Sequence, residues 1–309
     1  MNFKPITDLV AATFTPFDPD GGLNLDPVPQ IVDHLAKCSV SAIFINGTTG
    51  ESPSLTEAER LAAATAFTSA AKESGVASIV NVGHEALPVS CDLAAHAAEI
   101  GAGYIGVTAP TYFKPGSVAA LIEHVSLIAD CAPELPIYYY HIPRLSGVDL
   151  DMLELLRCAE RDLPNLVGIK YSDFELSAFI GCKRFSEGRY NMLFGSDEML
   201  LAGLAMGADG AVGSTYNFLA PLYNRIIADF RSGDIESAQN HQALAADLIR
   251  IIISTAGLPG LKAAMTLAGF DCGPHRSPLK TPSPGTFEEL RNRLEVAGFF
   301  NWNTPGGNA

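Results

Sequence analysis

The sequence predicts an α/β protein in which eight parallel strands close into a (β/α)8 TIM barrel, followed by a C-terminal helical extension. Two observations support this fold. Strand-like runs alternate with amphipathic helical stretches at a spacing of roughly 25 to 35 residues. Eight such units fit into roughly the first 230 residues, as a closed barrel requires. A doubly wound open sheet remains the alternative, because the number of units alone does not exclude it.

Each expected strand is a short apolar run bounded by turn residues. In chain order, the strands are expected at Leu9–Phe14, Ala42–Asn46, Ser78–Val82, Tyr104–Thr108, Ile137–Tyr140, Leu166–Lys170, Met192–Phe194 and Gly210–Ser214. The helices show the 3.6-residue apolar period and are expected at Pro29–Lys37, Glu57–Lys72, Pro88–Ile100, Val118–Cys131, Leu150–Arg161, Glu175–Arg184, Glu198–Met206 and Ala220–Arg231. Thr56 is a candidate N-cap, and Gly101 and Gly207 are candidate helix stops.

The strand pattern stops after Gly233, which predicts a barrel domain over residues 1–232. Three further helical stretches follow, at Ile235–Thr255, Leu261–Leu267 and Phe287–Ala297. We expect residues 233–300 to pack against the barrel or a neighbouring subunit rather than to form an independent domain. The segment 301–309 is rich in Asn, Gly and Pro and is expected to be a flexible tail.

Composition restricts the partners and the compartment. The formal net charge is −14 and no basic cluster is present, so binding to nucleic acid or to an anionic membrane surface is not expected. An anionic small substrate is still possible, because backbone N–H groups can bind it locally. The six cysteines are dispersed, and the sequence shows neither a secretory signal nor an apolar run long enough to span a bilayer. These features predict a soluble cytoplasmic protein with reduced thiols.

Lys170 is the first candidate for chemistry. It directly follows the apolar run Leu166–Ile169, and no other lysine lies in such a run. An ammonium group buried at this position loses hydration, which lowers its pKa. The neutral amine could then attack a ketone and form a Schiff base. The alternative is a lysine that ends the strand, reaches water or pairs with a carboxylate.

Glycines and hydroxyl side chains are concentrated where the expected strands end, which is the end of a barrel that carries active sites. In Gly47-Thr48-Thr49-Gly50-Glu51, two glycines allow a tight turn, and the N–H and hydroxyl donors between them could converge on a carboxylate. The alternative is an ordinary turn with exposed threonines.

The strand at Ile137–Tyr140 ends in three consecutive tyrosines. Because neighbouring strand residues face opposite sides, Tyr138 and Tyr140 should share one face and Tyr139 the other. A phenol close to a Schiff-base lysine could move protons during catalysis. The alternative for Tyr140 is a core tyrosine whose hydroxyl group is hydrogen-bonded.

Several other motifs do not indicate function. The segment 101–106 has the letters G-x-G-x-x-G, but it leads from a helix into a strand, the reverse of a dinucleotide-binding turn. The seven histidines show no metal-binding spacing, so no metal site is expected. Ser196 and Ser214 follow glycines without forming G-x-S-x-G, which argues against a serine hydrolase.

Five motifs at strand ends form a recognisable set in order and spacing: G-T-T-G-E at 47–51, Y-H-I-P at 140–143, G-I-K at 168–170, G-S-D-E at 195–198 and G-S-T-Y-N at 213–217. Over roughly residues 8–300, the chain resembles the N-acetylneuraminate lyase and dihydrodipicolinate synthase superfamily. The resemblance implies a cofactor-free class I aldolase on a (β/α)8 barrel with C-terminal helices, assembled as a homotetramer. It implies 2-oxo acids, pyruvate among them, as substrates.

The resemblance also assigns roles to individual residues. Lys170 would form the Schiff base with a 2-oxo acid, and Tyr140 would shuttle the proton. Thr48 and Thr49 would bind the pyruvate carboxylate through hydroxyl and backbone N–H groups. Tyr112 matches a tyrosine that reaches into the site of a neighbouring subunit, so the oligomer would be part of the catalytic unit.

The position two residues after Pro143 separates the branches of the superfamily. The synthase branch has an arginine there for a second carboxylate, whereas this chain has Leu145, as the lyase branch does, with Arg144 one place early. The resemblance to the lyase branch implies sugar-binding roles for Ser172, Gly195, Asp197, Glu198 and Ser214.

The expected reaction is reversible cleavage of N-acetylneuraminate to N-acetylmannosamine and pyruvate, without a metal. One alternative is another pyruvate-dependent aldolase or dehydratase, for instance one that acts on a 2-keto-3-deoxy sugar acid; dihydrodipicolinate synthesis is weakened by Leu145. A catalytically silent sugar-acid sensor is the non-enzyme alternative, although a sensor needs no nucleophile.

Overall fold

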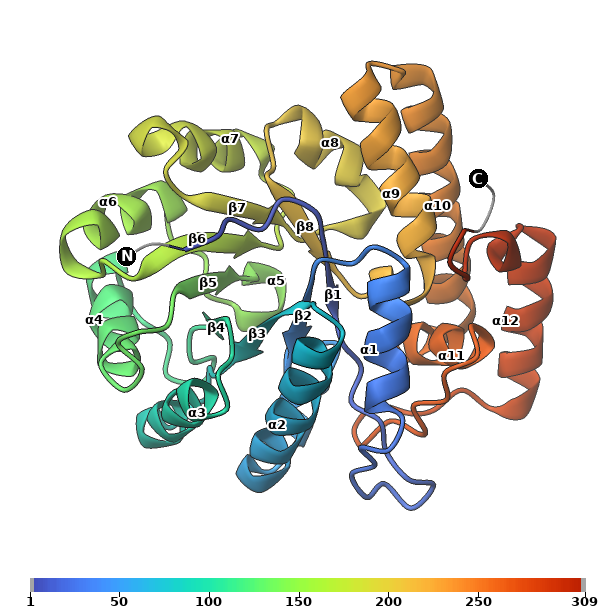
Figure 1. Ribbon diagram of the computed structural model, residues 1–309, viewed down its shortest axis with the longest axis horizontal. Helices are drawn as coiled ribbons and strands as arrows, with labels where there is room; N and C mark the ends of the chain where they lie inside the picture. The colour runs from blue at the N-terminus through green and yellow to red at the C-terminus, as the bar shows by residue number, and fades with distance from the viewer. Residues whose placement is uncertain (1–2, 307–309) are drawn as a thin grey trace.

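Eight parallel strands form a closed barrel in the computed structural model, which describes residues 3–306 (Figure 1). The strands are β1 (Leu9–Ala12), β2 (Ala42–Ile45), β3 (Ala77–Asn81), β4 (Tyr104–Val107), β5 (Ile137–His141), β6 (Leu166–Tyr171), β7 (Asn191–Phe194) and β8 (Gly210–Gly213). The barrel closes because β1 pairs in parallel with both β2 and β8, with Leu9 opposite Ala211. The predicted barrel is therefore confirmed, and the open sheet is excluded.

Helices alternate with the strands and form the outer layer (Figure 1). They are α1 (Val28–Lys37), α2 (Glu57–Glu73), α3 (Leu87–Glu99), α4 (Val118–Ala129), α6 (Met152–Asp162), α7 (Leu176–Arg184), α8 (Leu200–Ala205) and α9 (Tyr216–Ser232), with a single extra turn, α5 (Pro143–Ser146), after β5. Thr56 caps α2 through a capping box with Glu59, as the sequence indicated. α9 begins four residues before the expected Ala220, and its first turn is separated from the rest by a break in helical geometry at Leu219, two residues before Pro221.

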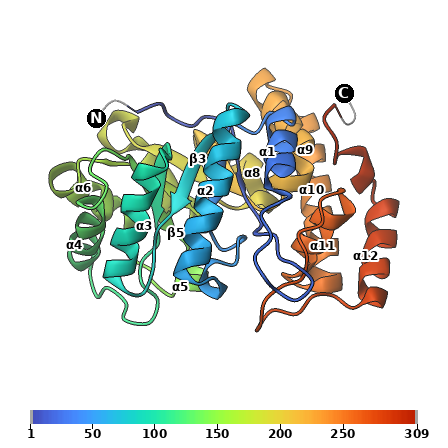
Figure 2. The same cartoon turned by 60° about the horizontal axis from the view of Figure 1, so that its bottom comes forward.

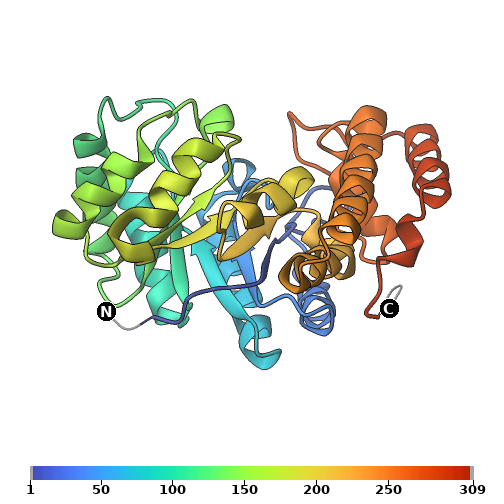
Figure 3. The same ribbon diagram turned by 90° about the horizontal axis from the view of Figure 1, so that it is seen from above.

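Three C-terminal helices follow the barrel: α10 (Ile235–Ala256), α11 (Gly260–Leu267) and α12 (Pro284–Val296). They lie together with α9 at one side of the barrel (Figure 3). Among residues 3–306, no single helix is both long and apolar enough to cross a membrane; α10 and α11, which meet at a bend of 116°, satisfy the length and composition criteria only as a pair.

The first residues of the expected flexible tail are packed against the protein. A 3-10 turn covers Phe299–Asn301, and the side chains of Trp302 and Asn303 are buried. The Trp302 ring lies edge-on to His241 with 5.5 Å between ring centroids. A single aromatic anchor of this kind can hold a segment whose composition otherwise indicates a mobile tail. Residues 307–309 of the expected tail lie outside the described part of the chain.

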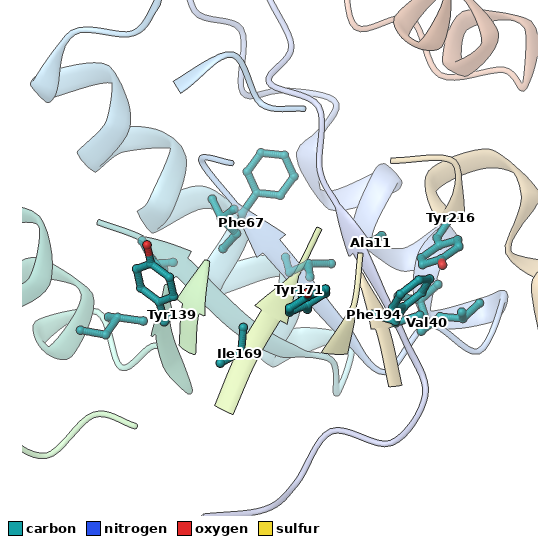
Figure 4. Close-up of a cluster of buried hydrophobic side chains, with 14 of the residues drawn as sticks. Ala11, Val40, Phe67, Tyr139, Ile169, Tyr171, Phe194 and Tyr216 are labelled. Carbon is teal, nitrogen blue, oxygen red and sulfur yellow. The ribbon is translucent and has the colours of Figure 1, made fainter. Parts of the chain in front are cut away.

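The alternating side chains of the strands divide the core into two parts. Tyr138 and Tyr140 point into the barrel, where they pack with Phe44 and Leu193. Tyr139 belongs to the outer cluster between the strands and the helices, so the predicted assignment of faces is confirmed. Figure 4 shows part of this outer cluster, including Tyr139 and other strand residues that face the helices: Ala11, Ile169, Tyr171 and Phe194.

Candidate active site

A cavity of about 170 Å³ lies at the carboxyl end of the barrel strands. Eight of the residues proposed from the sequence line it: Thr48, Thr49, Tyr140, Lys170, Ser172, Gly195, Asp197 and Ser214. These residues come from β5 and β6 and from the loops that follow β2, β6, β7 and β8. The parallel barrel brings them together because all strands end on the same side.

Lys170 is held inside the barrel by β6 and is only 3% exposed. Its Nζ lies 3.7 Å from the centre of the Tyr140 ring and 3.9 Å from the centre of the Phe44 ring. Because so little of the side chain is exposed, Lys170 does not reach bulk water. In residues 3–306, no carboxylate oxygen lies within 4.0 Å of its Nζ, so Lys170 forms no ion pair there. Burial lowers the pKa of Lys170 to about 7, although the charge of Asp197 acts in the opposite direction. A substantial fraction of the amine is therefore neutral and nucleophilic near neutral pH.

The Tyr140 ring lies next to Lys170 Nζ, and its hydroxyl oxygen is 3.3 Å from Thr48 Oγ1. Burial raises the pKa of Tyr140 to about 12, while the hydrogen bonds of Thr48 and Ser172 lower it. The phenol is therefore protonated at neutral pH, and it can pass a proton between a substrate oxygen and the Thr48 hydroxyl.

The loop after β2 is fixed against the loops that follow β1 and β8. Thr49 Oγ1 lies 2.6 Å from Ser214 Oγ. Thr15 Oγ1 donates a hydrogen bond of 2.7 Å to the carbonyl oxygen of Gly50. A Cβ atom at position 50 would lie only 3.1 Å from Thr15 Oγ1 and from the carbonyl oxygen of Thr13, so the tight contact favours glycine there.

Asp197 is a second buried ionisable group that lines the cavity. Its Oδ2 accepts hydrogen bonds from the backbone N–H and the hydroxyl group of Thr215, at 2.9 and 2.6 Å. Burial raises its pKa to about 6, although these hydrogen bonds and the charge of Lys170 act in the opposite direction. A Cβ atom at Gly213 would overlap the Asp197 carboxylate, which explains why glycine stands beside it.

Two of the proposed residues do not line the cavity. Glu198 follows Asp197 in the chain but is exposed. Tyr112 is 81% exposed and packs edge-on against Phe113, which is 83% exposed, with 5.0 Å between ring centroids. Arg144 also stays outside, because its guanidinium group stacks 4.8 Å above the centre of the Phe174 ring.

The C-terminal extension contributes a wall of the cavity that the sequence did not indicate. Leu258, Leu261, His275 and Leu279 line it, together with Glu51 from the loop after β2. Glu51 was part of a recognised motif, but nothing in the sequence assigned it a role. The four C-terminal residues lie in or beside irregular Pro- and Gly-rich chain, where no periodic signal marks a functional side chain.

In the part of the chain that the structure describes, no group of three or more His, Cys, Asp or Glu side chains is arranged to hold a metal ion. The six cysteines are free thiols, of which Cys38, Cys182 and Cys272 are buried.

Comparisons with known proteins agree with this geometry. Residues 5–297 match the model of the dihydrodipicolinate synthetase family. The chain is 42% identical over 307 residues to N-acetylneuraminate lyase from Rattus norvegicus, covering 98% of this chain and 95% of that protein. It is 39% identical over 303 residues to N-acetylneuraminate lyase from Homo sapiens, covering 97% and 95%. The solved N-acetylneuraminate lyase from Aliivibrio salmonicida aligns with a TM-score of 0.92 at 36% identity, covering 96% of this chain and 98% of that structure. The chain therefore belongs to the dihydrodipicolinate synthetase family, in which N-acetylneuraminate lyases resemble it over almost their whole length.

Proposed function

We propose that this protein is a Schiff-base aldolase that reversibly cleaves N-acetylneuraminate to N-acetylmannosamine and pyruvate. The observation that carries the proposal is the buried Lys170, whose pKa is lowered to about 7 inside a cavity bordered by hydroxyl groups. The lyase relatives, which match nearly the whole chain, support the choice of substrate.

Lys170 Nζ attacks the C2 ketone of the open-chain sugar, and loss of water gives a protonated imine. Tyr140 acts as a relay as the C3–C4 bond breaks: it accepts the proton of the C4 hydroxyl group while its own phenolic proton passes to the Thr48 hydroxyl, and the imine takes up the electron pair of that bond. N-acetylmannosamine then leaves, and the remaining enamine is protonated at C3. Hydrolysis of the resulting imine releases pyruvate and restores the amine. The iminium ion supplies the electrophile, so the proposed mechanism uses no metal and no cofactor.

Substrate contacts follow the position of the side chains around Lys170. Thr48 and Thr49 are proposed to bind the carboxylate through hydroxyl and backbone N–H groups. The sugar chain is proposed to contact Ser172, Gly195, Asp197 and Ser214, with Glu198 at its outer end. The two hydrogen bonds that Thr215 donates to Asp197 Oδ2 hold this carboxylate in place, which supports its role as an acceptor for sugar hydroxyl groups.

The active form is proposed to be a cytoplasmic homotetramer, a dimer of dimers in which Tyr112 completes the site of a neighbouring subunit. The strong exposure of Tyr112 and Phe113 supports a protein contact at this position, because adjacent large aromatic side chains are seldom left in water. Sedimentation analysis of the wild type and of Tyr112→Ala, with activity measured on the same samples, tests this part of the proposal.

The function is tested by measuring pyruvate release from N-acetylneuraminate and from 2-keto-3-deoxygluconate. Rapid release from the first substrate supports the proposal, whereas release only from the second would retain the Lys170 chemistry and reject the sugar assignment. Borohydride reduction in the presence of pyruvate separates an enzyme from a sensor, because only an imine gives a stable adduct. Lys170→Ala should abolish both turnover and trapping; substantial residual turnover would refute the covalent mechanism.

A further inference from the structure

A second buried lysine lies beside the cavity, and the proposed chemistry does not use it. Lys262, in α11, is 2% exposed, and its Nζ donates a hydrogen bond of 3.0 Å to Oε1 of Glu51, which is 4% exposed. The same Nζ donates to the carbonyl oxygen of Pro274 at 2.9 Å. The ion pair therefore joins the C-terminal extension to the loop after β2.

Both carboxylate oxygens of Glu51 have partners from the C-terminal extension. His275 Nδ1 lies 3.0 Å from Oε1, and the backbone N–H of Arg276 donates 3.1 Å to Oε2. Burial alone would raise the pKa of Glu51, but His275, Lys262 and Arg276 together lower it below its usual value. The carboxylate is therefore ionised at neutral pH, and it lines the cavity.

Glu51 also fixes the backbone of the loop that carries Thr48 and Thr49. Its φ is +54°, a left-handed conformation that non-glycine residues adopt at a cost. The Glu51 N–H donates 3.0 Å to the carbonyl oxygen of Thr48, and Ser52 N–H donates 3.3 Å to that of Gly47. We therefore expect a displacement of Glu51 to shift the backbone of Thr48, through the hydrogen bond between the Glu51 N–H and the Thr48 carbonyl oxygen.

Arg276 attaches the same C-terminal segment to the rest of this end of the barrel. Its guanidinium group donates to Glu59 Oε2 at 2.7 Å, to the carbonyl oxygen of Ser54 at 3.0 Å and to that of Gly21 at 2.8 Å. The segment between α11 and α12 accordingly lies beside the loop that follows β1 (Figure 1 and Figure 2). The Arg276 guanidinium and Lys262 Nζ lie 4.3 and 4.2 Å from the centre of the Phe17 ring.

The Lys262 ammonium group compensates the negative charge of Glu51 next to the carboxylate-binding loop. Glu51 holds the loop, but an uncompensated carboxylate next to that loop would repel an anionic substrate bound by Thr48 and Thr49. In the dry surroundings of Glu51, the repulsion would be poorly screened. Lys262 supplies the compensating positive charge at 3.0 Å without entering the cavity lining.

We propose that Lys262 is a positioning residue for substrate binding: it neutralises Glu51, so that Glu51 can fix the carboxylate-binding loop without repelling the substrate carboxylate. This inference rests on the proposed function, in which the loop binds the carboxylate of a 2-oxo acid. It assigns the C-terminal extension a part in the binding of anionic substrates, in addition to its packing role.

The test compares Lys262→Met, Lys262→Gln and the double variant Glu51→Gln/Lys262→Met in the condensation of pyruvate with N-acetylmannosamine. Both single variants should raise the KM for pyruvate by about tenfold or more while kcat changes much less, because the loss lies in binding an anion. The double variant removes both charges and should recover much of the KM. Lys183→Met is the matched control. It breaks the ion pair between Lys183 Nζ and Asp209 Oδ1, which are 2.7 Å apart, and neither residue lines the cavity, so the KM for pyruvate should stay unchanged.

Lys262→Gln keeps a hydrogen-bond donor for Glu51, so it decides the question if Lys262→Met does not fold. An unchanged KM for pyruvate in a folded Lys262→Gln protein would overturn the inference. A double variant with a KM as high as that of Lys262→Met would equally overturn it, because the defect would then be one of packing. If the wild type forms no borohydride-trappable imine with pyruvate, the proposed function itself fails, and that result is separate from both of these outcomes.

Discussion

Replacement of Lys170 by methionine is expected to stabilise the folded protein while it abolishes imine formation. Methionine has a similar length but no charge, so the variant removes the cost of holding an ammonium group among the rings of Phe44 and Tyr140. Residues arranged for catalysis often reduce stability, and a buried lysine without a carboxylate partner is an extreme example.

The size and the pH dependence of this effect follow from the two pKa values of Lys170. The folded-state pKa is about 7 and the ordinary value is 10.5, so the folded state binds fewer protons than the unfolded state between these values. Stability therefore increases with pH in this window, and the cost of the lysine is complete below pH 7 and absent above 10.5. At about 1.4 kcal/mol per pH unit, the methionine variant should gain on the order of 5 kcal/mol at pH 6 and about 2 kcal/mol at pH 9.

Urea unfolding at pH 6 and pH 9, at one subunit concentration, measures both gains. Lys280→Met is the control, because Lys280 is exposed and its loss should change stability little at either pH. A gain for Lys170→Met that is equal at the two pH values would show that burial does not control the charge of Lys170. A loss of stability at both pH values would refute the reasoning altogether.

Three further predictions concern the immediate surroundings of Lys170. Tyr140→Phe should lower kcat for cleavage by about 10²- to 10⁴-fold but leave borohydride trapping with pyruvate in place, which would separate proton transfer from imine formation. Asp197→Asn removes a charge that raises the pKa of Lys170, so the pH profile of trapping should shift to lower pH, and a shift to higher pH would contradict the electrostatic role of Asp197. Gly213→Ala places a methyl group against the Asp197 carboxylate and should cost about 1–3 kcal/mol of stability together with most of the activity, measured by urea unfolding and pyruvate release.

The fold could be predicted because strand and helix periods alternate clearly along the chain. Closure of the barrel was predicted from the number of units, but that number did not exclude an open sheet, since closure depends on the pairing of β1 with β8, whose partners Leu9 and Ala211 lie far apart in the sequence. Element ends differed by a few residues for local reasons. β1, for example, ends at Ala12 rather than at Phe14, since its pairing with β2 ends with Ala12 opposite Phe44.

The part of the candidate site that lies on strand ends was accessible to sequence reasoning. Lys170 and Tyr140 stand out because a charged or phenolic group ends a buried run. Lys262 does not stand out, since a lysine in a short amphipathic helix usually faces water. Its partner Glu51 is 211 residues away in the sequence, and only the packing of α11 onto the barrel brings the two together.

The contrast between the two buried lysines leads to a last prediction. Burial lowers the pKa of both, but Glu51 raises that of Lys262 through its charge and a hydrogen bond, whereas Lys170 has only the more distant charge of Asp197. The Lys262 amine donates hydrogen bonds to Glu51 and Pro274, and these contacts favour its ammonium form, which has no free lone pair for attack. Borohydride reduction with pyruvate, followed by peptide mass spectrometry, should find the adduct on Lys170 and none on Lys262. An adduct on Lys262 would show that burial alone, without regard to the partner, makes a lysine nucleophilic in this protein.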